Sequence, residues 1–332
     1  MKRKLIFHIG AHRTATSSLQ EYMFRNIKAL KRLGYLYPLH KRRHFELIND
    51  LFSGARSPAD AAALLGARLH AHKQLDLHTI ILSDEDICMR RNLEVLAGFR
   101  KFFDVKVVFT LRRQDLWLES WYLQNVKWQW VPHLSHCSFD GFMAHQDDFH
   151  WIHYDRYVQH LEQLFGPENV ILNIHEKQQM PDGPLEAFCR SIGLQPSAEF
   201  VQPAKVNPSF SPLMSEFMRC LPLDAAGQDY RRVLTRACAE ADRALQPEGP
   251  QSSLLMPHAQ RQQVMAQFAA GNRALAQRRF GRDALFLEPL PGPEAPLAQR
   301  QLPQDPYVLM EQFVAPLLSG VISHQQKSGG KG

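Results

Sequence analysis

The feature that most constrains the fold is the alternation of short apolar strands with helices over the first two hundred residues. Strands are predicted at residues 4–10, 34–38, 78–83, 105–111 and 169–175. Helices are predicted at residues 16–32, 58–74, 92–102, 114–127, 154–165 and 184–192. Such alternation indicates a parallel sheet with helices on both faces. We therefore expect an α/β fold that binds its ligand beyond the carboxyl ends of the strands.

Beyond residue 200 the pattern changes to helices, which are expected at residues 212–221, 228–245 and 257–279. We assign residues 1–200 to the α/β core and residues 201–288 to a mostly helical part of the same domain. Residues 289–332 are assigned to a Pro-rich segment and a flexible tail.

Two features of the composition bear on location. No apolar run reaches the roughly 18 residues that a membrane helix needs, so no transmembrane segment is expected. The five cysteines are an odd number without a C-x-x-C pair, which suits free thiols in a reducing compartment. We therefore expect a cytoplasmic protein.

Positive charge is concentrated near the N-terminus. Residues 1–50 contain eleven Lys and Arg but three acidic residues, whereas the whole chain has a net charge of +6. The remainder is therefore slightly acidic, and general nucleic-acid binding is not expected. A localised basic region indicates a defined anionic partner instead.

A hydroxyl-rich loop joins the first strand to the first helix. Its sequence is GAHRTATSSLQ, and Thr14 or Thr16 is expected to cap the helix. A helix N-terminus with unpaired N–H groups, a nearby guanidinium and several hydroxyls is suited to binding an anion. The simpler alternative is a plain helix cap. The candidate binding residues are Gly10, Ala11, His12, Arg13, Thr14, Ala15, Thr16, Ser17 and Ser18.

This loop is not the nucleoside-triphosphate loop G-x-x-x-x-G-K-[ST]. Counted from Gly10, that pattern requires a second glycine and then a lysine, where this chain has Ala15 and Thr16. An atypical P-loop kinase is therefore kept only as an alternative.

Two further polar clusters follow strands. Arg112 ends the strand at 105–111, and Ser120 lies eight residues later in TLRRQDLWLESWY. A guanidinium and a hydroxyl can bind a second phosphate, although an Arg pair bridged to Asp115 or Glu119 is the alternative. The turn Asp84-Glu85-Asp86 follows the strand at 78–83 and offers either a general base or a plain acidic helix start.

The hydroxyl-rich loop and the cluster of Arg112 and Ser120 resemble those of sulfotransferases that use 3′-phosphoadenosine 5′-phosphosulfate (PAPS). HIGAHRTATSSLQ resembles the 5′-phosphosulfate loop of that family, with Arg13 in place of the usual lysine and Ala15 in place of the usual glycine. Arg112 and Ser120 match the family's Arg and Ser that contact the 3′-phosphate. The resemblance extends through FHWIHYDRYVQHLEQLFGPENV and covers most of residues 4–286.

The resemblance implies the P-loop-like sulfotransferase fold and the transfer of a sulfuryl group from PAPS to an acceptor hydroxyl, with 3′,5′-ADP as product and no metal. We favour a carbohydrate or a lipid-linked glycan as acceptor.

The family places its base, a His or a Glu, after the equivalent strand. This placement indicates Glu85, with Asp84 and Asp86 as close rivals and His12 as a rarer candidate. Arg13 would assist the leaving phosphate. The alternative from another class is a non-catalytic protein that binds adenosine phosphates or an anionic glycan.

Aromatic and histidine residues gather in the middle of the chain. All five tryptophans fall within residues 117–151, where they could form an acceptor-side wall, although core packing is expected for Trp117 and Trp121. His133-x-x-His136-Cys137 and His150-x-x-His153 have metal-like spacing, but surface histidine pairs are more common and no metal site is predicted.

The remaining N-terminal cations are interpreted as a solvated face: Lys28, Lys31, Arg32, Lys41, Arg42 and Arg43.

Overall fold

A computed structural model describes residues 2–203, 210–245 and 252–329 of the chain. The last three residues of the predicted tail lie outside these ranges. The chain divides into two compact units, each made of several segments. The first comprises Met1–Gln114, Phe149–Val206 and Ala266–Pro289, and the second comprises Asp115–Asp148, Asn207–Met265 and Leu290–Gly332.

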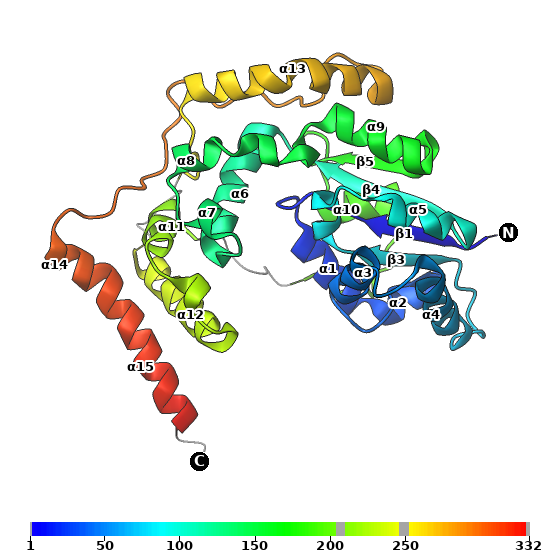
Figure 1. The fold of residues 1–332 in the computed structure, drawn as a ribbon, viewed down its shortest axis with the longest axis horizontal. Coiled ribbons are helices and arrows are strands. Elements are labelled where there is room, and N and C mark those ends of the chain that lie inside the picture. Colours follow the sequence, from blue (N-terminus) through cyan, green and yellow to red (C-terminus); the bar gives the residue numbers. More distant parts are fainter. Residues whose placement is uncertain (1, 204–209, 246–251, 330–332) are drawn as a thin grey trace. The chain divides into compact units, whose positions relative to one another are not determined.

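The first unit is built on a five-stranded parallel sheet, as the sequence predicts. Its strands are β1 (Lys4–His8), β2 (Tyr35–Leu36), β3 (Thr79–Ser83), β4 (Asp104–Leu111) and β5 (Val170–Ile174). Their order is β2-β3-β1-β4-β5, and every neighbouring pair is parallel (Figure 1). The centre of β1 is completely buried because helices cover both faces of the sheet.

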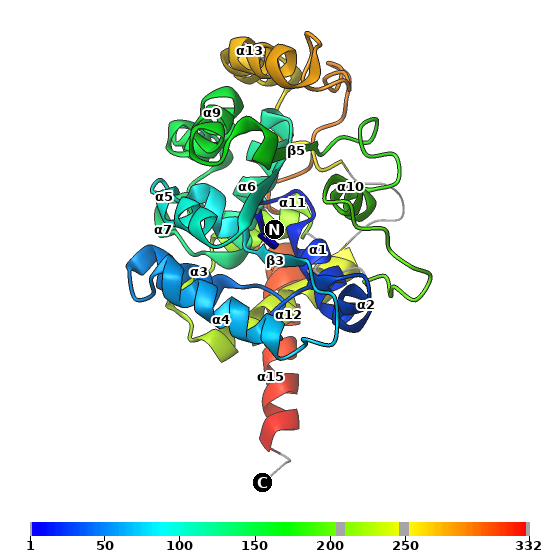
Figure 2. The same ribbon diagram turned by 90° about the vertical axis from the view of Figure 1, so that its right-hand side faces the viewer.

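Helices cover the sheet on two sides, which confirms the expected α/β fold. Figure 2 shows α1 (Thr16–Arg25), α2 (Ile27–Arg32) and α10 (Pro184–Ser191) on one side. On the other side lie α4 (Pro58–His70), α5 (Glu94–Ala97) and α9 (Tyr154–Phe165). The first unit also contains α3 (Phe45–Ser53), which was not predicted, and the C-terminal part of α13 (His258–Phe280).

Two predicted helices are divided in the structure. The helix expected at 16–32 breaks at Asn26, whose side-chain amide donates hydrogen bonds to the carbonyl oxygens of Tyr22 and Val201. The helix expected at 92–102 is α5 followed by a 3₁₀ turn at Gly98–Lys101. Apolar spacing alone does not reveal the break at Asn26, because its hydrogen bond to Val201 joins residues far apart in the sequence.

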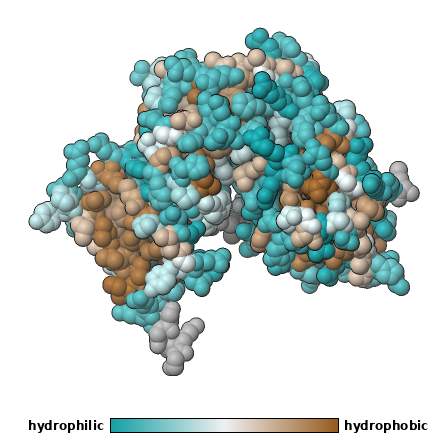
Figure 3. Space-filling model, viewed as in Figure 1, coloured by the Kyte–Doolittle hydropathy of each residue, from teal (hydrophilic) through white to brown (hydrophobic). Residues whose placement is uncertain are grey.

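The second unit is helical. Its described helices include α6 (Gln114–Trp128), α7 (Pro132–Ser135), α8 (Phe139–Met143), α11 (Pro212–Arg219), α12 (Gln228–Leu245), the N-terminal part of α13, α14 (Pro306–Leu309) and α15 (Ala315–Gly329). Helices α12 and α15 pack closely, and Gly320 lies so near Ala237 that an added Cβ would approach to 2.6 Å. Helix α15 thus extends to residue 329, into the C-terminal segment HQQKSGGKG (residues 324–332) that was expected to be a flexible tail. It also exposes apolar side chains, including Leu318 and Ile322. Figure 3 shows apolar surface in the region of this helix.

Candidate functional site

The predicted phosphate loop lies at the carboxyl end of β1 and is hydrogen-bonded to β4. The Ile9 N–H donates to the carbonyl of Val108, and the Ala11 N–H donates to that of Thr110. The Thr110 N–H donates in return to the carbonyl of Gly10, at 2.7 Å. This backbone ladder extends past the strand and holds the start of the loop.

Gly10 permits the loop to approach the acidic turn after β3. Its φ is +103°, a conformation that L side chains rarely adopt. A Cβ added at this position would lie 3.3 Å from the Glu85 carbonyl oxygen and 3.2 Å from the His12 nitrogen. The glycine therefore brings two of the predicted clusters together.

The loop enters α1 through two residues in the left-handed region. Arg13 has φ 65° and Ala15, the N-cap of α1, has φ 66°. The expectation that a threonine caps the helix is wrong, since the N-cap is Ala15 and makes no side-chain hydrogen bond. The Thr14 hydroxyl instead donates to the Ala11 carbonyl at 2.7 Å. The first N–H groups of a helix have no partner within it, and they carry the positive end of its dipole.

The two predicted phosphate-binding arginines are neighbours. Nη1 of Arg112 donates a hydrogen bond of 2.7 Å to the carbonyl oxygen of Arg13. Burial lowers the pKa of the Arg13 guanidinium, although an arginine stays charged at neutral pH. Tyr154 fixes the backbone at Arg112, because its hydroxyl accepts from the Arg112 N–H at 3.1 Å.

His175 belongs to the same region and was not predicted. It follows β5, and its N–H donates to the Leu111 carbonyl at 2.7 Å. Burial, followed by the charges of Arg112 and Arg13, lowers the pKa of His175 to about 4. A neutral imidazole therefore lies near both guanidiniums. Its position directly after a strand is the signal that could have found it.

The other residues of the second motif are buried. Ser120 lies on α6 in the second unit. Arg113 donates to the carbonyls of Glu288 and Pro289, both at 2.9 Å, so it anchors the end of the first unit. Asp115 and Glu119, the alternative partners considered for the Arg pair, both bind the fully buried Arg261 of the second unit, at 2.5 and 2.6 Å.

The acidic turn after β3 contains three carboxylates in different environments. Asp84 is completely buried, and its Oδ1 accepts from Nε and Nη2 of Arg43 at 2.8 and 2.6 Å. Burial raises the pKa of Asp84 to about 6, although Arg43 partly offsets the effect. Asp84 is thus a sequestered carboxyl group that contacts an arginine.

Asp86 behaves in the opposite way. Its carboxylate pairs with Nε2 of His12 at 3.1 Å and with Arg43. Burial opposes ionisation of Asp86, but His12 and Arg43 outweigh it and lower its pKa to about 2. His12 is therefore bound to a carboxylate that stays ionised.

Glu85 lies between these two carboxylates. It is 7% exposed, and one of its oxygens, Oε2, accepts a hydrogen bond from the side-chain amide of Gln20 on α1. Nε of Arg43 lies 3.7 Å from the same oxygen. Glu85 thus keeps a small exposed surface while being held from two elements.

Arg43 was wrongly assigned to a solvated face. It contacts all three carboxylates of the turn. The next residue explains its position: the His44 N–H donates to the Ser83 carbonyl, and the Ser83 N–H donates to Nδ1 of His44, both at 3.0 Å. Burial lowers the pKa of His44 to about 4, so the ring is neutral and can accept this bond.

The tryptophans divide between core and surface. Trp117 and Trp121 are buried in the second unit and stack with ring centroids 5.5 Å apart, as expected for core residues. Trp128 and Trp130 stack almost in parallel at 5.7 Å, and Trp130 is 52% exposed. An acceptor-side role for this pair stays a prediction.

Among the described residues, we find no helix with the length and hydropathy of a membrane span.

Comparisons with known proteins give distant similarities. No family model matches the chain. An uncharacterized protein from Archaeoglobus fulgidus is 28% identical over 216 residues, which is 63% of this chain and 55% of that protein. The chain thus matches about half the length of this relative. The crystal structure of a sulfotransferase from Alicyclobacillus acidocaldarius is similar with a TM-score of 0.39 and 17% identity, over 70% of this chain and all of that chain.

Proposed function

We propose that this chain is a sulfotransferase that moves the sulfuryl group of PAPS to an acceptor hydroxyl. The observation that carries the proposal is the hydrogen bond from Arg112 to the Arg13 carbonyl. It joins two sequence motifs that independently suit phosphate binding. Glu85 lies against the same loop at Gly10, so anion-binding groups and a carboxylate meet at one edge of the sheet.

The donor set suits PAPS. The loop offers backbone N–H groups at the start of α1, hydroxyls of Ser17 and Ser18, and the Arg13 guanidinium, all of which bind anions. The resemblance assigns the 5′-phosphosulfate to this loop and the 3′-phosphate to Arg112 and Ser120. When bound, PAPS supplies the activated sulfuryl group on a phosphosulfate anhydride.

Glu85 is the best candidate for the base that accepts the hydroxyl proton. Asp84 is fully buried and cannot reach an acceptor. Asp86 has a pKa of about 2, which makes it a poor proton acceptor. His12 is bound to Asp86, so we assign it to positioning that carboxylate. Glu85 is left as the carboxylate with an exposed edge and a hydrogen bond from Gln20 that orients it.

A carbohydrate or lipid-linked glycan remains the favoured acceptor class. The choice rests on the sequence, in which aromatic residues that could stack on a sugar gather within residues 117–151.

The proposal is tested by incubating the full chain with sulfur-labelled PAPS and a panel of carbohydrate, lipid-linked glycan and phenolic acceptors. We expect label on one acceptor class together with an equal amount of 3′,5′-ADP. Tight binding of 3′,5′-ADP with no transfer to any acceptor would contradict the proposal and favour a binding protein. Transfer of phosphate from ATP in the same panel would favour the kinase alternative.

A further inference from the structure

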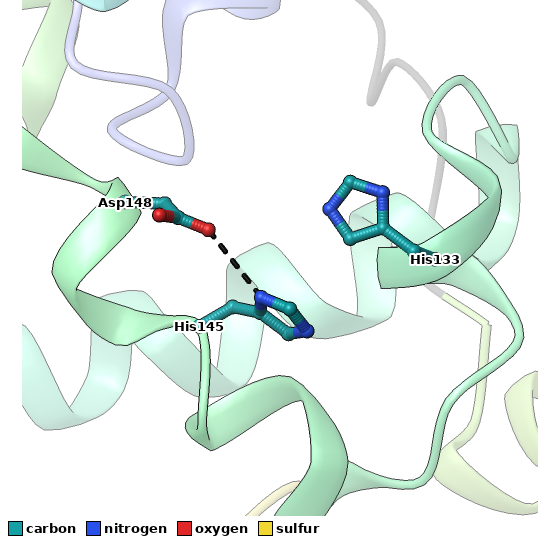
Figure 4. A group of neighbouring side chains, drawn as sticks. All are labelled: His133, His145 and Asp148. Atoms are coloured by element: carbon teal, nitrogen blue, oxygen red, sulfur yellow. Dashed lines mark ion pairs between the residues drawn. The ribbon is translucent and has the colours of Figure 1, made fainter.

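We propose that His133, His145 and Asp148 bind a divalent transition-metal ion, with zinc as the ion to test first. One ligand atom from each side chain lies within 4.8 Å of the others (Figure 4). All three residues belong to one segment of the second unit, Asp115–Asp148. The proposal is independent of the proposed function, because none of these residues is in the phosphate loop or the acidic turn.

The three side chains come from short, well-anchored elements. His133 is on α7, which starts at Pro132. The N–H of His145 donates to the carbonyl of Phe142, whose side chain is fully buried, and the N–H of Asp148 donates to the carbonyl of His145. Two of the ligands are thus linked through one turn of backbone that is fixed to the core.

The spacing is close to that of a metal site. Nδ1 of His145 lies 3.4 Å from Oδ2 of Asp148, and the two imidazole rings have centroids 5.1 Å apart. Zinc bonds of about 2.0–2.1 Å in a tetrahedron place ligand atoms about 3.3 Å apart. The His145–Asp148 pair already has this separation. His133 is exposed, so a side-chain rotation can close the remaining gap, which is at most about 1.5 Å.

The chemical types of the three proposed ligands favour a transition-metal ion such as zinc. Two imidazoles and one carboxylate form the His₂-carboxylate group found in zinc sites that keep an open position. Calcium and magnesium prefer oxygen ligands alone, so they fit less well. A bound ion would join α7 to the segment that follows α8.

In the structure, His133 lies beside His145 and not beside His136, the residue that its sequence spacing suggests. His136, three residues after His133, has Nδ1 2.9 Å from the Arg219 carbonyl oxygen and Nε2 3.2 Å from the Asp224 carboxylate. The partner is instead His145, brought back by the turn through α8. No metal site was predicted from the sequence, because surface histidine pairs are more common than metal sites at that spacing.

The test uses the full chain without a polyhistidine tag, freed of metal by a chelator and titrated with Zn²⁺ in a calorimeter. We expect one tight site per chain. His133→Ala and Asp148→Asn should each weaken binding at least tenfold. Asp147→Asn removes an adjacent exposed carboxylate outside the cluster and should leave the affinity unchanged.

A second measurement separates binding from folding. Co²⁺ gives a visible absorption spectrum that reports the ligand set directly, and it should be lost in His133→Ala while the far-ultraviolet circular dichroism is unchanged. Absence of a stoichiometric site in the unaltered chain would overturn the proposal. So would a zinc affinity of Asp148→Asn equal to that of the unaltered chain, because the proposed ligand would then be dispensable.

Discussion

The guanidinium of Arg112 donates a hydrogen bond of 2.7 Å to the carbonyl oxygen of Arg13. The two residues are 99 positions apart in the chain, and each lies just beyond the carboxyl end of its strand. Because β1 and β4 are parallel neighbours, both motifs reach the same edge of the sheet. The contact therefore brings together the two sequence motifs that we propose bind phosphate.

Replacement of Arg112 tests the proposed 3′-phosphate contact. We expect Arg112→Ala to weaken 3′,5′-ADP binding about 10- to 100-fold, since a charge-assisted hydrogen bond contributes about 1.5–3 kcal/mol. Binding of 5′-AMP, which lacks the 3′-phosphate, should change much less. Arg112→Gln keeps a donor for the Arg13 carbonyl but removes the charge, so it should resemble Arg112→Ala. Calorimetry showing equal losses for both nucleotides would refute the assignment.

Replacement of Glu85 tests the proposed base. Glu85→Gln preserves the shape but cannot accept the acceptor proton, so turnover should fall by about 10²-fold or more while 3′,5′-ADP affinity stays within about threefold. The matched control is Glu94→Gln, which alters an exposed glutamate at the start of α5. Turnover equal to that of the unaltered chain would refute the role of Glu85.

Stability should depend on pH through Asp84. Its pKa is raised to about 6 in the folded chain by burial, from an ordinary value of 3.8. Between about pH 4 and pH 6, Asp84 is largely ionised in the unfolded chain but still protonated in the folded chain. Rising pH therefore favours the unfolded state, and the folded state loses stability across this pH range. The full effect is about 3 kcal/mol for a difference of about two pKa units.

Asp84→Asn removes this titration. The free energy of unfolding of the variant minus that of the unaltered chain should therefore increase by up to about 3 kcal/mol between about pH 4 and pH 7. Urea denaturation at several pH values measures this difference. Asp229→Asn, at a carboxylate that is 94% exposed, provides the control and should give a flat difference. A flat line for Asp84→Asn would contradict the raised pKa.

The loop before α1 offers a stabilising substitution. Ala15 has φ 66°, a conformation that costs an alanine about 1–2 kcal/mol, whereas glycine adopts it readily. Ala15→Gly should raise the free energy of unfolding by up to about 1 kcal/mol after the greater entropy of glycine in the unfolded chain is subtracted. Ala63→Gly in α4 should instead lower it by about 0.5–1 kcal/mol. Thermal denaturation of both variants should give shifts of opposite sign.

Local patterns were sufficient to predict the sheet and the loop. The apolar runs at β1, β3, β4 and β5 are buried between helices, and their parallel arrangement follows from the helices that connect them. The hydroxyl-rich segment at the end of β1 could be recognised because its residues are contiguous.

Contacts between distant residues could not be predicted in the same way. Arg43 and Asp84 are 41 positions apart, and their pairing depends on the His44–Ser83 hydrogen bonds. The differing burial of Asp84 and Glu85 is likewise invisible in a run of three acidic residues, because it depends on which side chain turns toward the core.

The sequence by itself determined the parallel α/β fold and the two motifs that suit phosphate binding, since both are encoded in residues close together along the chain. Only the tertiary structure decided which charges meet. It placed Arg43 among the carboxylates, His175 near Arg112 and Arg13, and His133 beside His145. The physical reason is that burial and electrostatic pairing depend on how distant segments pack together. The residue pattern within a single segment does not predict that packing.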